Sequence, residues 1–216
     1  MRTNKTYAVF GLGRYGRAVA KELVDNGIEV LAVDMQQSIV NDAAAYLPIC
    51  KCADVTDAEV IARLGVAELD TVIICMASNL EASVMAVTLC KEAGVKTVIA
   101  KCANEMHQKI LLRVGADEVV FPEKESGIRL AKNLLSSGFI DMISLSKDVS
   151  MVEINVKDEW VGKNLIELNL RKKYGVNIVA IKKGEEVDVN INPEAPMKQD
   201  TTLIVIANPA KLAKLK

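Results

Sequence analysis

The sequence predicts an α/β fold: a Rossmann-like, doubly wound parallel sheet, followed by a helical connector and a small α+β lobe. Over the first 122 residues, short runs rich in β-branched residues alternate with longer amphipathic runs, the pattern of repeated βα units. The cores of these short runs are apolar throughout, which is typical of parallel strands covered on both faces. After Pro122, apolar and polar residues alternate, as in half-exposed antiparallel strands.

The first lobe, residues 1–122, is expected to contain six strands and five helices. The strands are residues 7–10, 29–34, 47–52, 71–75, 98–100 and 119–121. The helices are residues 14–26, a segment running through 45, and residues 57–64, 81–93 and 104–114. Thr56 or Asp57 is a suitable N-cap for the third helix, and Gly94 ends the fourth. Repeated βα units of this kind predict right-handed crossovers and a parallel sheet.

The second lobe, residues 141–216, follows a connector at residues 123–140 whose amphipathic part is 126–137. Its expected strands are residues 151–156, 178–181, 187–191 and 203–206, with one short helix near 164–171. Trp160, which precedes Gly162 in an expected turn, is predicted to pack inside this lobe.

Composition excludes several classes of protein. The 216-residue chain has 27 Lys and Arg against 28 Asp and Glu, a net charge of -1, so no fold-wide cationic field for nucleic acid or anionic lipid is expected. Three Phe, four Tyr and one Trp are few for stacking single-stranded RNA. The longest stretches without a charge, 71–80 and 201–210, are about half of a membrane span. We therefore expect a cytosolic protein that does not insert into the membrane.

The five cysteines indicate a reducing compartment. They are odd in number and lie in apolar stretches, which predicts reduced, buried thiols. Cys50 and Cys52 would share one face of a strand, but no second Cys or His pair follows to complete four ligands. A zinc site is therefore not expected.

The strongest functional signal is Gly11-Leu12-Gly13-Arg14-Tyr15-Gly16. It directly follows an expected strand and opens an expected helix, and an acidic residue, Asp34, ends the next strand 23 positions after the first glycine. That context is what the dinucleotide-binding fingerprint requires. One glycine permits the tight turn, one lets phosphates approach the backbone, and one lets helix and strand pack closely. The helix N-terminus then offers N–H groups and a positive dipole to phosphate.

Charged residues around this motif narrow the ligand. Asp34 is expected to accept hydrogen bonds from ribose hydroxyls, and because no Arg lies between Arg17 and Arg63, NADP is disfavoured while NAD, ATP, ADP and AMP remain open. Asp54 would reach the adenine edge or a backbone amide, or serve as a turn aspartate. Arg14 opposes the helix dipole, so a phosphate partner is favoured, either over its own site or in a neighbouring subunit.

Catalysis is not expected. A hydride-transfer enzyme needs a proton donor beside the nicotinamide, and the single histidine, His107, lies on a helix after the fifth strand. No Tyr is followed by Lys four positions later, and no paired carboxylates with an adjacent base stand out. The sequence therefore predicts a binding protein rather than an enzyme.

These residues resemble the RCK regulatory subunits of Ktr/Trk-type potassium uptake systems. The resemblance spans nearly the whole chain and includes segments that are specific to it. The segments are residues 7–16, 31–34, 115–117, 121–124 and 171–175 with 178–181. The Pro-Glu-Lys that follows the sixth strand and the Arg-x-Lys-Tyr-Gly of the small lobe are the most specific of these. A single copy of the two lobes indicates the Ktr-like branch.

The resemblance implies a nucleotide-sensing gating ring that regulates a membrane-embedded potassium transporter through exchange of ATP and ADP, with NAD(H) as another nucleotide. Such chains form dimers that assemble into an octameric ring, attached peripherally to the cytoplasmic face of the membrane through the transporter. The implied cofactor-binding residues are Gly11, Leu12, Gly13, Arg14, Tyr15, Gly16, Asp34, Met35, Asp54, Val55, Ala77, Ser78, Lys101, His107 and Glu123.

Three of these residues carry further expectations. Arg14 would read the γ-phosphate bound to the neighbouring chain. Glu123 would lie at the dimer interface, where a divalent or sodium ion could join it; alternatively, it would only complement the dipole of the connecting helix. His107 would line the phosphate side, although an exposed helix face is the slightly favoured interpretation.

The small lobe resembles the part of the family that binds cyclic di-AMP between two copies. The matching positions are Leu165, Arg171, Asn177, Ile178 and Pro193. Arg171 could contact a phosphate, but a salt-bridged helix end is the preferred interpretation.

Two other functions remain as alternatives. One is a small NAD(H)-linked oxidoreductase or redox-sensing protein, against which the missing proton donor argues. The other is a redox-sensing, DNA-binding repressor of Rossmann type, which would need a basic helix-turn-helix segment that the sequence does not show.

Overall fold

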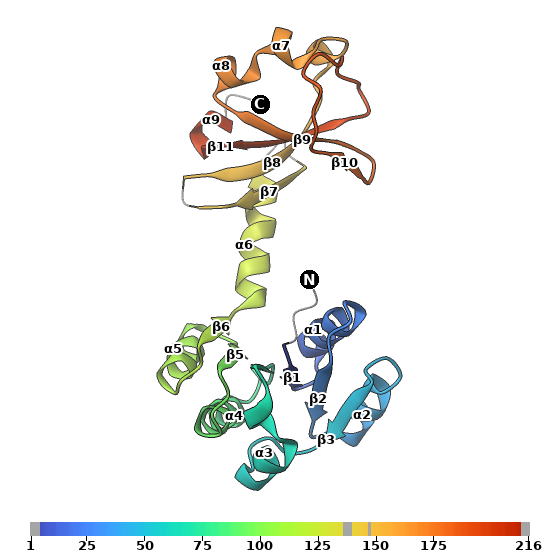
Figure 1. The fold of residues 1–216 in the computed structure, drawn as a ribbon. Helices are drawn as coiled ribbons and strands as arrows, with labels where there is room; N and C mark the ends of the chain where they lie inside the picture. Colours follow the sequence, from blue (N-terminus) through green and yellow to red (C-terminus); the bar gives the residue numbers. More distant parts are fainter. Residues whose placement is uncertain (1–4, 136–139, 147, 213–216) are drawn as a thin grey trace. The chain divides into compact units, whose positions relative to one another are not determined.

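The computed structural model describes residues 5–135, 140–146 and 148–212. The chain forms two compact units, Met1–Pro122 and Glu123–Lys216 (Figure 1).

The first unit is built on a parallel sheet whose strands lie in the order β3-β2-β1-β4-β5-β6. The predicted doubly wound fold is therefore confirmed. The strands are β1 (Tyr7–Phe10), β2 (Val30–Asp34), β3 (Ile49–Cys52), β4 (Thr71–Ile74), β5 (Thr97–Lys101) and β6 (Glu118–Val120).

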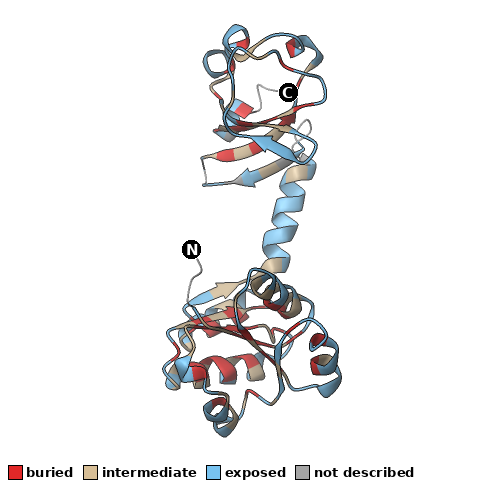
Figure 2. Ribbon diagram, turned by 45° about the vertical axis from the view of Figure 1, so that its right-hand side comes forward, coloured by how far each residue is buried: buried red, intermediate tan, exposed pale blue. Residues whose placement is uncertain are grey.

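Helices cover both faces of this sheet because alternate residues of each strand point to opposite sides. On β1, Ala8 and Phe10 belong to one buried cluster and Val9 to another. The first cluster includes residues of α3, α4 and α5, and the second includes residues of α1 and α2. Figure 2 shows buried residues on both the strands and the helices of this unit. The helices are α1 (Arg14–Asp25), α2 (Gln37–Ala43), α3 (Ala58–Leu64), α4 (Leu80–Glu92) and α5 (Glu105–Arg113), with a 3-10 turn η1 (Val66–Glu68) after α3.

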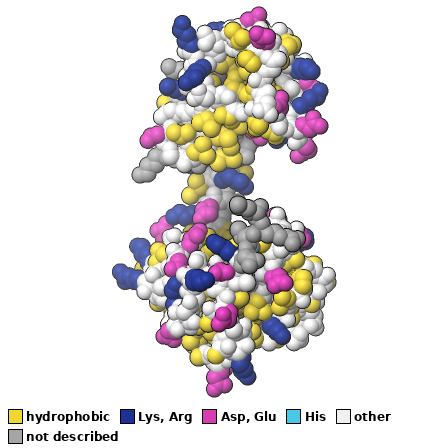
Figure 3. Space-filling view, viewed as in Figure 1, with side chains coloured by type: hydrophobic (Ala, Val, Ile, Leu, Met, Phe, Trp, Pro, Cys, Tyr) yellow, Lys and Arg dark blue, Asp and Glu magenta, His cyan; other side chains and the backbone are white. Residues whose placement is uncertain are grey.

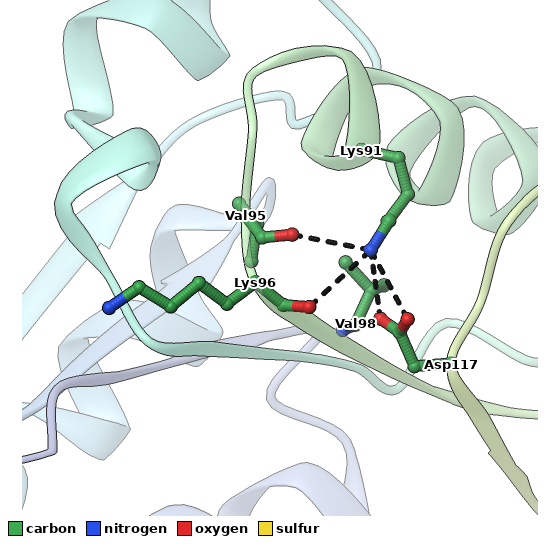
Figure 4. Close-up of polar contacts among 5 residues, drawn as sticks. All are labelled: Lys91, Val95, Lys96, Val98 and Asp117. Atoms are coloured by element: carbon green, nitrogen blue, oxygen red, sulfur yellow. Dashed lines mark hydrogen bonds and ion pairs between the residues drawn. The ribbon is translucent and has the colours of Figure 1, made fainter.

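A polar cluster fixes the junction of α4, β5 and β6 (Figure 4). The Asp117 carboxylate accepts a hydrogen bond from the Val98 N–H at 2.7 Å and pairs with the Lys91 ammonium at 3.0 Å. Lys91 also donates to the Val95 carbonyl at 3.3 Å. Burial alone would raise the pKa of Asp117, but the Val98 N–H and the Lys91 ammonium together lower it below its ordinary value. The ionised carboxylate thus holds the start of β5 in register.

The second unit contains helix α6 and an antiparallel sheet. The sheet order is β10-β9-β11-β8-β7. Alternating burial along β8 confirms the half-exposed strand predicted at 151–156, whereas β10, in the run predicted at 187–191, is exposed throughout. The elements are α6 (Pro122–Leu135), β7 (Asp141–Ser144), β8 (Ser150–Asn155), η2 (Asp158–Trp160), α7 (Leu165–Leu168), α8 (Leu170–Tyr174), β9 (Asn177–Lys183), β10 (Glu186–Asp188), β11 (Thr202–Ala207) and α9 (Pro209–Leu212).

Three expectations for the second unit were wrong in detail. The helix expected at 164–171 is broken at Asn169, whose φ of 45° is left-handed, so two short helices form. The strand expected at 187–191 is the shorter β10, Glu186–Asp188, because it pairs only with the end of β9. Strand β7 was not expected. Trp160 is buried, with 3% of its surface exposed, as predicted.

The cysteine expectation holds only in part. Cys90 and Cys102 are buried, but Cys52 is exposed at the end of β3 and Cys50 is half-buried. Strand β3 is the edge of the sheet, and three of its four residues are exposed.

Apolar side chains are exposed on α6 and β7. Figure 3 shows apolar atoms gathered over β7 and β8 on one face of the second unit. The exposed residues include Leu130 and Leu134 on α6, Ile143 on β7, and Leu145 directly after β7. In the described ranges, no helix is both long enough and apolar enough to cross a membrane.

We expect Gly16→Ala to destabilise the first unit by about 3 kcal/mol, because the new Cβ would lie 2.0 Å from the Gly11 carbonyl oxygen. Gly13→Ala is the control: no atom lies within 4 Å of its Cβ position, so its cost should stay within about 1 kcal/mol. Urea unfolding of both variants measures the difference. Equal stability of the two would contradict the contact.

Candidate functional site

A pocket of about 260 Å³ lies in the first unit, where β1, β2, β3 and β4 end. Seven of the residues predicted from sequence line it. They are Gly11, Gly13, Asp34, Met35, Asp54, Val55 and Ser78. The sequence therefore located residues that are widely spaced in the chain but adjacent in the fold.

The pocket occupies the point where the strand order changes direction. The chain passes from β1 through α1 to β2 on one side of β1, and later from β3 through α3 to β4 on the other side. The loops after β1 and β4 consequently diverge to opposite faces of the sheet. In open α/β sheets, ligands bind in the crevice formed at such a point.

The three motif glycines are required for different reasons. Gly11 has a φ of +89°, and a Cβ there would lie 2.8 Å from Met76 Cγ. Gly16 is buried, and a Cβ there would meet the Gly11 carbonyl oxygen at 2.0 Å. Gly13 is exposed, with extended backbone at the N-cap of α1 and open space around its Cβ position. Of the three, only Gly13 has open space at its Cβ position, where a ligand can approach the backbone.

Asp34 fixes the glycine turn. One carboxylate oxygen accepts from the Leu12 N–H at 2.7 Å, and the other accepts from the Gln36 N–H at 2.9 Å. A carboxylate oxygen can accept more than one hydrogen bond, so these contacts leave capacity for a ligand hydroxyl. Leu12 is buried and contributes its N–H to this contact rather than a side chain to the pocket wall.

Asp54 forms a turn with Thr56. Its carboxylate accepts from the Thr56 hydroxyl at 2.7 Å and from the Thr56 N–H at 2.9 Å. These two hydrogen bonds, the hydroxyl first, lower the pKa of Asp54 below its ordinary value. The structure thus shows the backbone-amide and turn role that the sequence offered as an alternative to an adenine contact.

Two arginines of α1 differ in their contacts. Arg14 is exposed at the first helical position, and its side chain makes no ion pair or hydrogen bond to any residue that the structure describes. Arg17, which sequence reasoning did not select, donates from Nε to the Leu12 carbonyl at 2.6 Å. The position of Arg17 in the sequence does not predict this contact, because the contact depends on the conformation of the glycine turn.

Lys101 and Tyr15 lie together rather than in the pocket lining. The Lys101 ammonium is 5.8 Å from the centroid of the Tyr15 ring, within the range of a cation–π contact. Lys101 ends β5 and Tyr15 lies in the first turn of α1. This contact therefore joins the fifth strand to the helix that follows the glycine turn.

His107 is buried, with 3% of its surface exposed, so the expectation of an exposed helix face was wrong. Its Nδ1 accepts from the Ala103 N–H at 3.3 Å, which leaves Nε2–H to donate to the Ser83 hydroxyl at 2.7 Å. That hydroxyl donates to the Leu80 carbonyl at 3.0 Å. Burial lowers the pKa of His107 below its usual 6.5. The imidazole is thus a neutral link between α4 and α5.

His107 also lines a second hollow of about 340 Å³ beside the pocket, together with Ala77 and Ser78. Because Ser78 lines both, the two hollows adjoin. Ser83 was missed by the sequence analysis, since a serine inside a helix carries no signal of its buried partner.

Glu123 and the residues predicted in the small lobe belong to the second unit. Glu123 is exposed in the first turn of α6. Among residues 5–135, 140–146 and 148–212, no group of three or more His, Cys, Asp or Glu side chains is placed to hold a metal ion. A cation at Glu123 would therefore not be held by a cluster of three or more such side chains from these residues.

The five small-lobe residues are only partly brought together. The Leu165 N–H donates to the Pro193 carbonyl at 3.0 Å, while Asn177 and Ile178 begin β9. Arg171 is exposed on α8 and has no ion pair to a described residue, so the expected salt bridge is not seen there.

Comparison with known proteins identifies the family. The TrkA-N domain model matches residues 7–122, and the TrkA-C domain model matches residues 149–216. The chain belongs to the TrkA-N/TrkA-C family. These are RCK domains, so the resemblance seen in the sequence is confirmed.

Members of this family resemble the chain over nearly its full length. Ktr system potassium uptake protein C of Bacillus subtilis is 37% identical over 98% of this chain and 96% of its own. Ktr system potassium uptake protein A of Vibrio alginolyticus is 36% identical over 99% of this chain and 97% of its own. The chain is accordingly of the regulatory type, not a catalytic enzyme, which excludes the oxidoreductase alternative.

A solved structure shares the fold. The GsuK channel bound to NAD superposes with a TM-score of 0.66 at 18% identity, over 99% of this chain. This chain spans 39% of the channel chain. At that identity the likeness concerns the fold alone.

We expect the stability of the first unit to fall as pH drops below about 6.5. Unfolded His107 binds a proton near that pH, whereas the folded imidazole has a lowered pKa, so protons favour the unfolded chain. The contribution of the neutral His107 side chain to the free energy of unfolding is complete above about pH 6.5. It is lost as the pH falls toward and through the pKa of His107 in the folded protein.

Since His107 is the single histidine of the chain, His107→Gln should flatten the profile between pH 5 and 7. Urea unfolding at several pH values measures this. An unchanged slope in the variant would show that another group is responsible.

Proposed function

We propose that this protein is the nucleotide-sensing regulatory subunit of a Ktr-type potassium uptake system, and that ATP and ADP exchange in the pocket of its first unit. The relatives named above are potassium uptake proteins. The observation that carries the nucleotide proposal is the convergence of Gly13, Asp34 and Ser78 on one pocket at the sheet's switch point.

The chemistry of the pocket suits an adenine nucleotide. The N-terminus of α1 begins at the exposed Gly13, and the first N–H groups of a helix bind phosphate well. Asp34 retains acceptor capacity for ribose hydroxyls, and no arginine lies near it in sequence to neutralise a 2′-phosphate. NAD(H) shares these requirements and is the competing ligand.

The size of the pocket supports recognition by a second copy. At about 260 Å³ it is smaller than the roughly 300–1,000 Å³ of most ligand pockets. A nucleotide seated there would extend beyond this pocket, into the adjoining hollow of about 340 Å³ or to the surface. Arg14, exposed and without a described partner, is a suitable donor to the γ-phosphate held by a neighbouring chain.

Assembly follows from the same proposal. The exposed apolar residues of α6 and β7 supply a surface for dimers, which would form an octameric ring beneath the membrane-embedded transporter. The ring lies at the cytoplasmic face of the membrane and is attached to it through the transporter. A ligand shifts such a ring only by its differential affinity for two shapes, and a tenfold preference is about 1.4 kcal/mol per site.

Two further ligands belong to the proposal. A divalent or sodium ion would join Glu123 at the dimer interface, supported by the exposure of this carboxylate in the first turn of α6. Cyclic di-AMP would bind between small lobes near Leu165, Arg171, Asn177, Ile178 and Pro193, supported by the exposure of Arg171.

Gly13→Ala should weaken ATP and ADP binding at least tenfold while the fold survives, because its Cβ has open space in the protein but would occupy the approach of the phosphates. Gly127→Ala, also without neighbours around its Cβ position, is the matched control. Calorimetric titration with ATP, ADP, NAD and NADH, together with light scattering for mass, provides the measurement. Tight NADH binding to a dimer, with weak ATP binding, would refute the proposal.

Arg14→Ala should reduce the preference for ATP over ADP about tenfold and leave ADP affinity nearly unchanged. The reason is that the guanidinium would contact only the γ-phosphate. Arg63→Ala, an exposed arginine in the last turn of α3, controls for loss of charge. Competition titrations on the assembled protein measure the ratio. Equal losses for both nucleotides would show that Arg14 does not read the γ-phosphate.

A further inference from the structure

Arg17 is held by the backbone of the glycine turn rather than by an acidic partner. Its Nε donates to the Leu12 carbonyl at 2.6 Å, and its own N–H donates to the Gly13 carbonyl at 2.9 Å. No carboxylate of the described residues pairs with its guanidinium. The side chain is half-buried near the start of α1, where a cation opposes the helix dipole. Neither an ion pair nor the dipole therefore stabilises Arg17 here, but the hydrogen bond to Leu12 does.

The Leu12–Gly13 peptide links this hydrogen bond to the nucleotide pocket. The peptide is trans, so the Leu12 C=O and the Gly13 N–H lie in one plane and point in opposite directions. The Leu12 carbonyl points towards Arg17, and neither of these residues lines the pocket, whereas Gly13 does. The Gly13 N–H is thereby directed away from Arg17, on the side from which a phosphate would approach.

The Gly13 N–H is also the donor that the turn leaves unused. The Gly11 N–H donates to the Val33 carbonyl at 2.8 Å, and the Leu12 N–H donates to the Asp34 carboxylate at 2.7 Å. The N–H of Gly13 makes no hydrogen bond to any residue that the structure describes. Of the three N–H groups at positions 11–13, it alone is therefore available to a ligand, and such a group at a helix N-terminus suits a phosphate.

Glycine at position 13 does not by itself fix the orientation of this peptide. Gly13 has a φ of -67°, but glycine adopts positive φ about as readily, so it does not exclude rotation of the peptide by half a turn. In the rotated form the Leu12 carbonyl oxygen, which is partially negative, would face the phosphates in place of the N–H. The hydrogen bond from the ionised Arg17 holds the carbonyl on the opposite side. It thus favours the orientation that can bind an anion.

We propose that Arg17 is a positioning residue for phosphate binding: by holding the Leu12 carbonyl, it keeps the Gly13 N–H directed at the diphosphate of a bound nucleotide. Arg17 acts through this peptide and does not itself contact the ligand. The inference rests on the proposed function in that the pocket binds a nucleotide, but it applies equally to ADP, ATP and NAD, because each contains a diphosphate. Arg17 thus differs from Arg14, whose proposed contact is with the γ-phosphate alone.

Two variants separate the hydrogen bond of Arg17 from its charge. In Arg17→Gln, the side-chain nitrogen Nε2 is as many bonds from Cα as the arginine Nε, so the donor is kept while the charge is lost. In Arg17→Met, a methyl group takes that place, so the donor and the charge are both lost. Arg63→Met, in the exposed last turn of α3, controls for the loss of a surface charge.

The full chain of each variant is titrated calorimetrically with adenosine, ADP and NAD, after circular dichroism confirms folding. Arg17→Met should weaken binding of ADP and NAD about tenfold and leave adenosine affinity unchanged, because adenosine has no phosphate. Arg17→Gln should recover most of the lost ADP affinity, and Arg63→Met should match the unaltered protein. A merely structural role for Arg17 would instead weaken adenosine and ADP by the same factor.

Three results would overturn the proposal: unchanged ADP and NAD affinity in Arg17→Met, equal losses for adenosine and ADP, or equal losses in the methionine and glutamine variants. The last of these would show that the charge of Arg17 matters rather than its hydrogen bond. Failure of the proposed function gives a different pattern. An unaltered protein that binds NAD but not ADP would refute exchange of ATP and ADP, and the NAD titrations would still decide the role of Arg17. An unaltered protein that binds none of the three ligands would refute both.

Discussion

The close approach of Gly16 to the Gly11 carbonyl is the constraint on which the pocket depends. A Cβ at Gly16 would lie 2.0 Å from that oxygen, so only glycine lets α1 lie directly against the turn after β1. This position places the helix N-terminus, with its partial positive charge, at the edge of the sheet where β2 and β4 also end. Asp34 then secures the turn through the Leu12 N–H. The pocket is thus set by backbone geometry, and side chains complete it.

In the proposed function, this arrangement would separate the residues that hold a nucleotide from the residue that distinguishes one nucleotide from another. Gly13 and Asp34 would contact parts that ATP, ADP and NAD have in common, so they would not discriminate strongly between these ligands. Discrimination requires a group that meets only the terminal phosphate. Within one chain the exposed Arg14 has no described partner, which suits a role between subunits. If assembly is the means of regulation, as proposed, the nucleotide would then be distinguished at the interface between subunits.

Much of the first unit could be predicted because its signals are local. The apolar strand cores, the glycine motif and the acidic residue at the end of β2 can each be recognised from a few residues of sequence. The switch point follows from the order of the βα units along the chain. Features that depend on distant partners could not be predicted. His107 is buried because Ser83, on another helix, satisfies its Nε2–H, and Arg17 matters because of how the turn closes. The left-handed Asn169 and the strand β7 were missed for a similar reason, since β7 is stabilised by pairing with β8.

The chain of hydrogen bonds through His107 has a direction. It runs from the Ala103 N–H through the imidazole to the Ser83 hydroxyl and ends at the Leu80 carbonyl. The two side chains in the middle, His107 and Ser83, each donate and accept, so replacing either by an apolar residue leaves a buried polar group of the other without its partner. In related sequences, positions 83 and 107 should therefore change together or not at all. Substitutions at these two positions should therefore be coupled in evolution, although the residues lie on different helices.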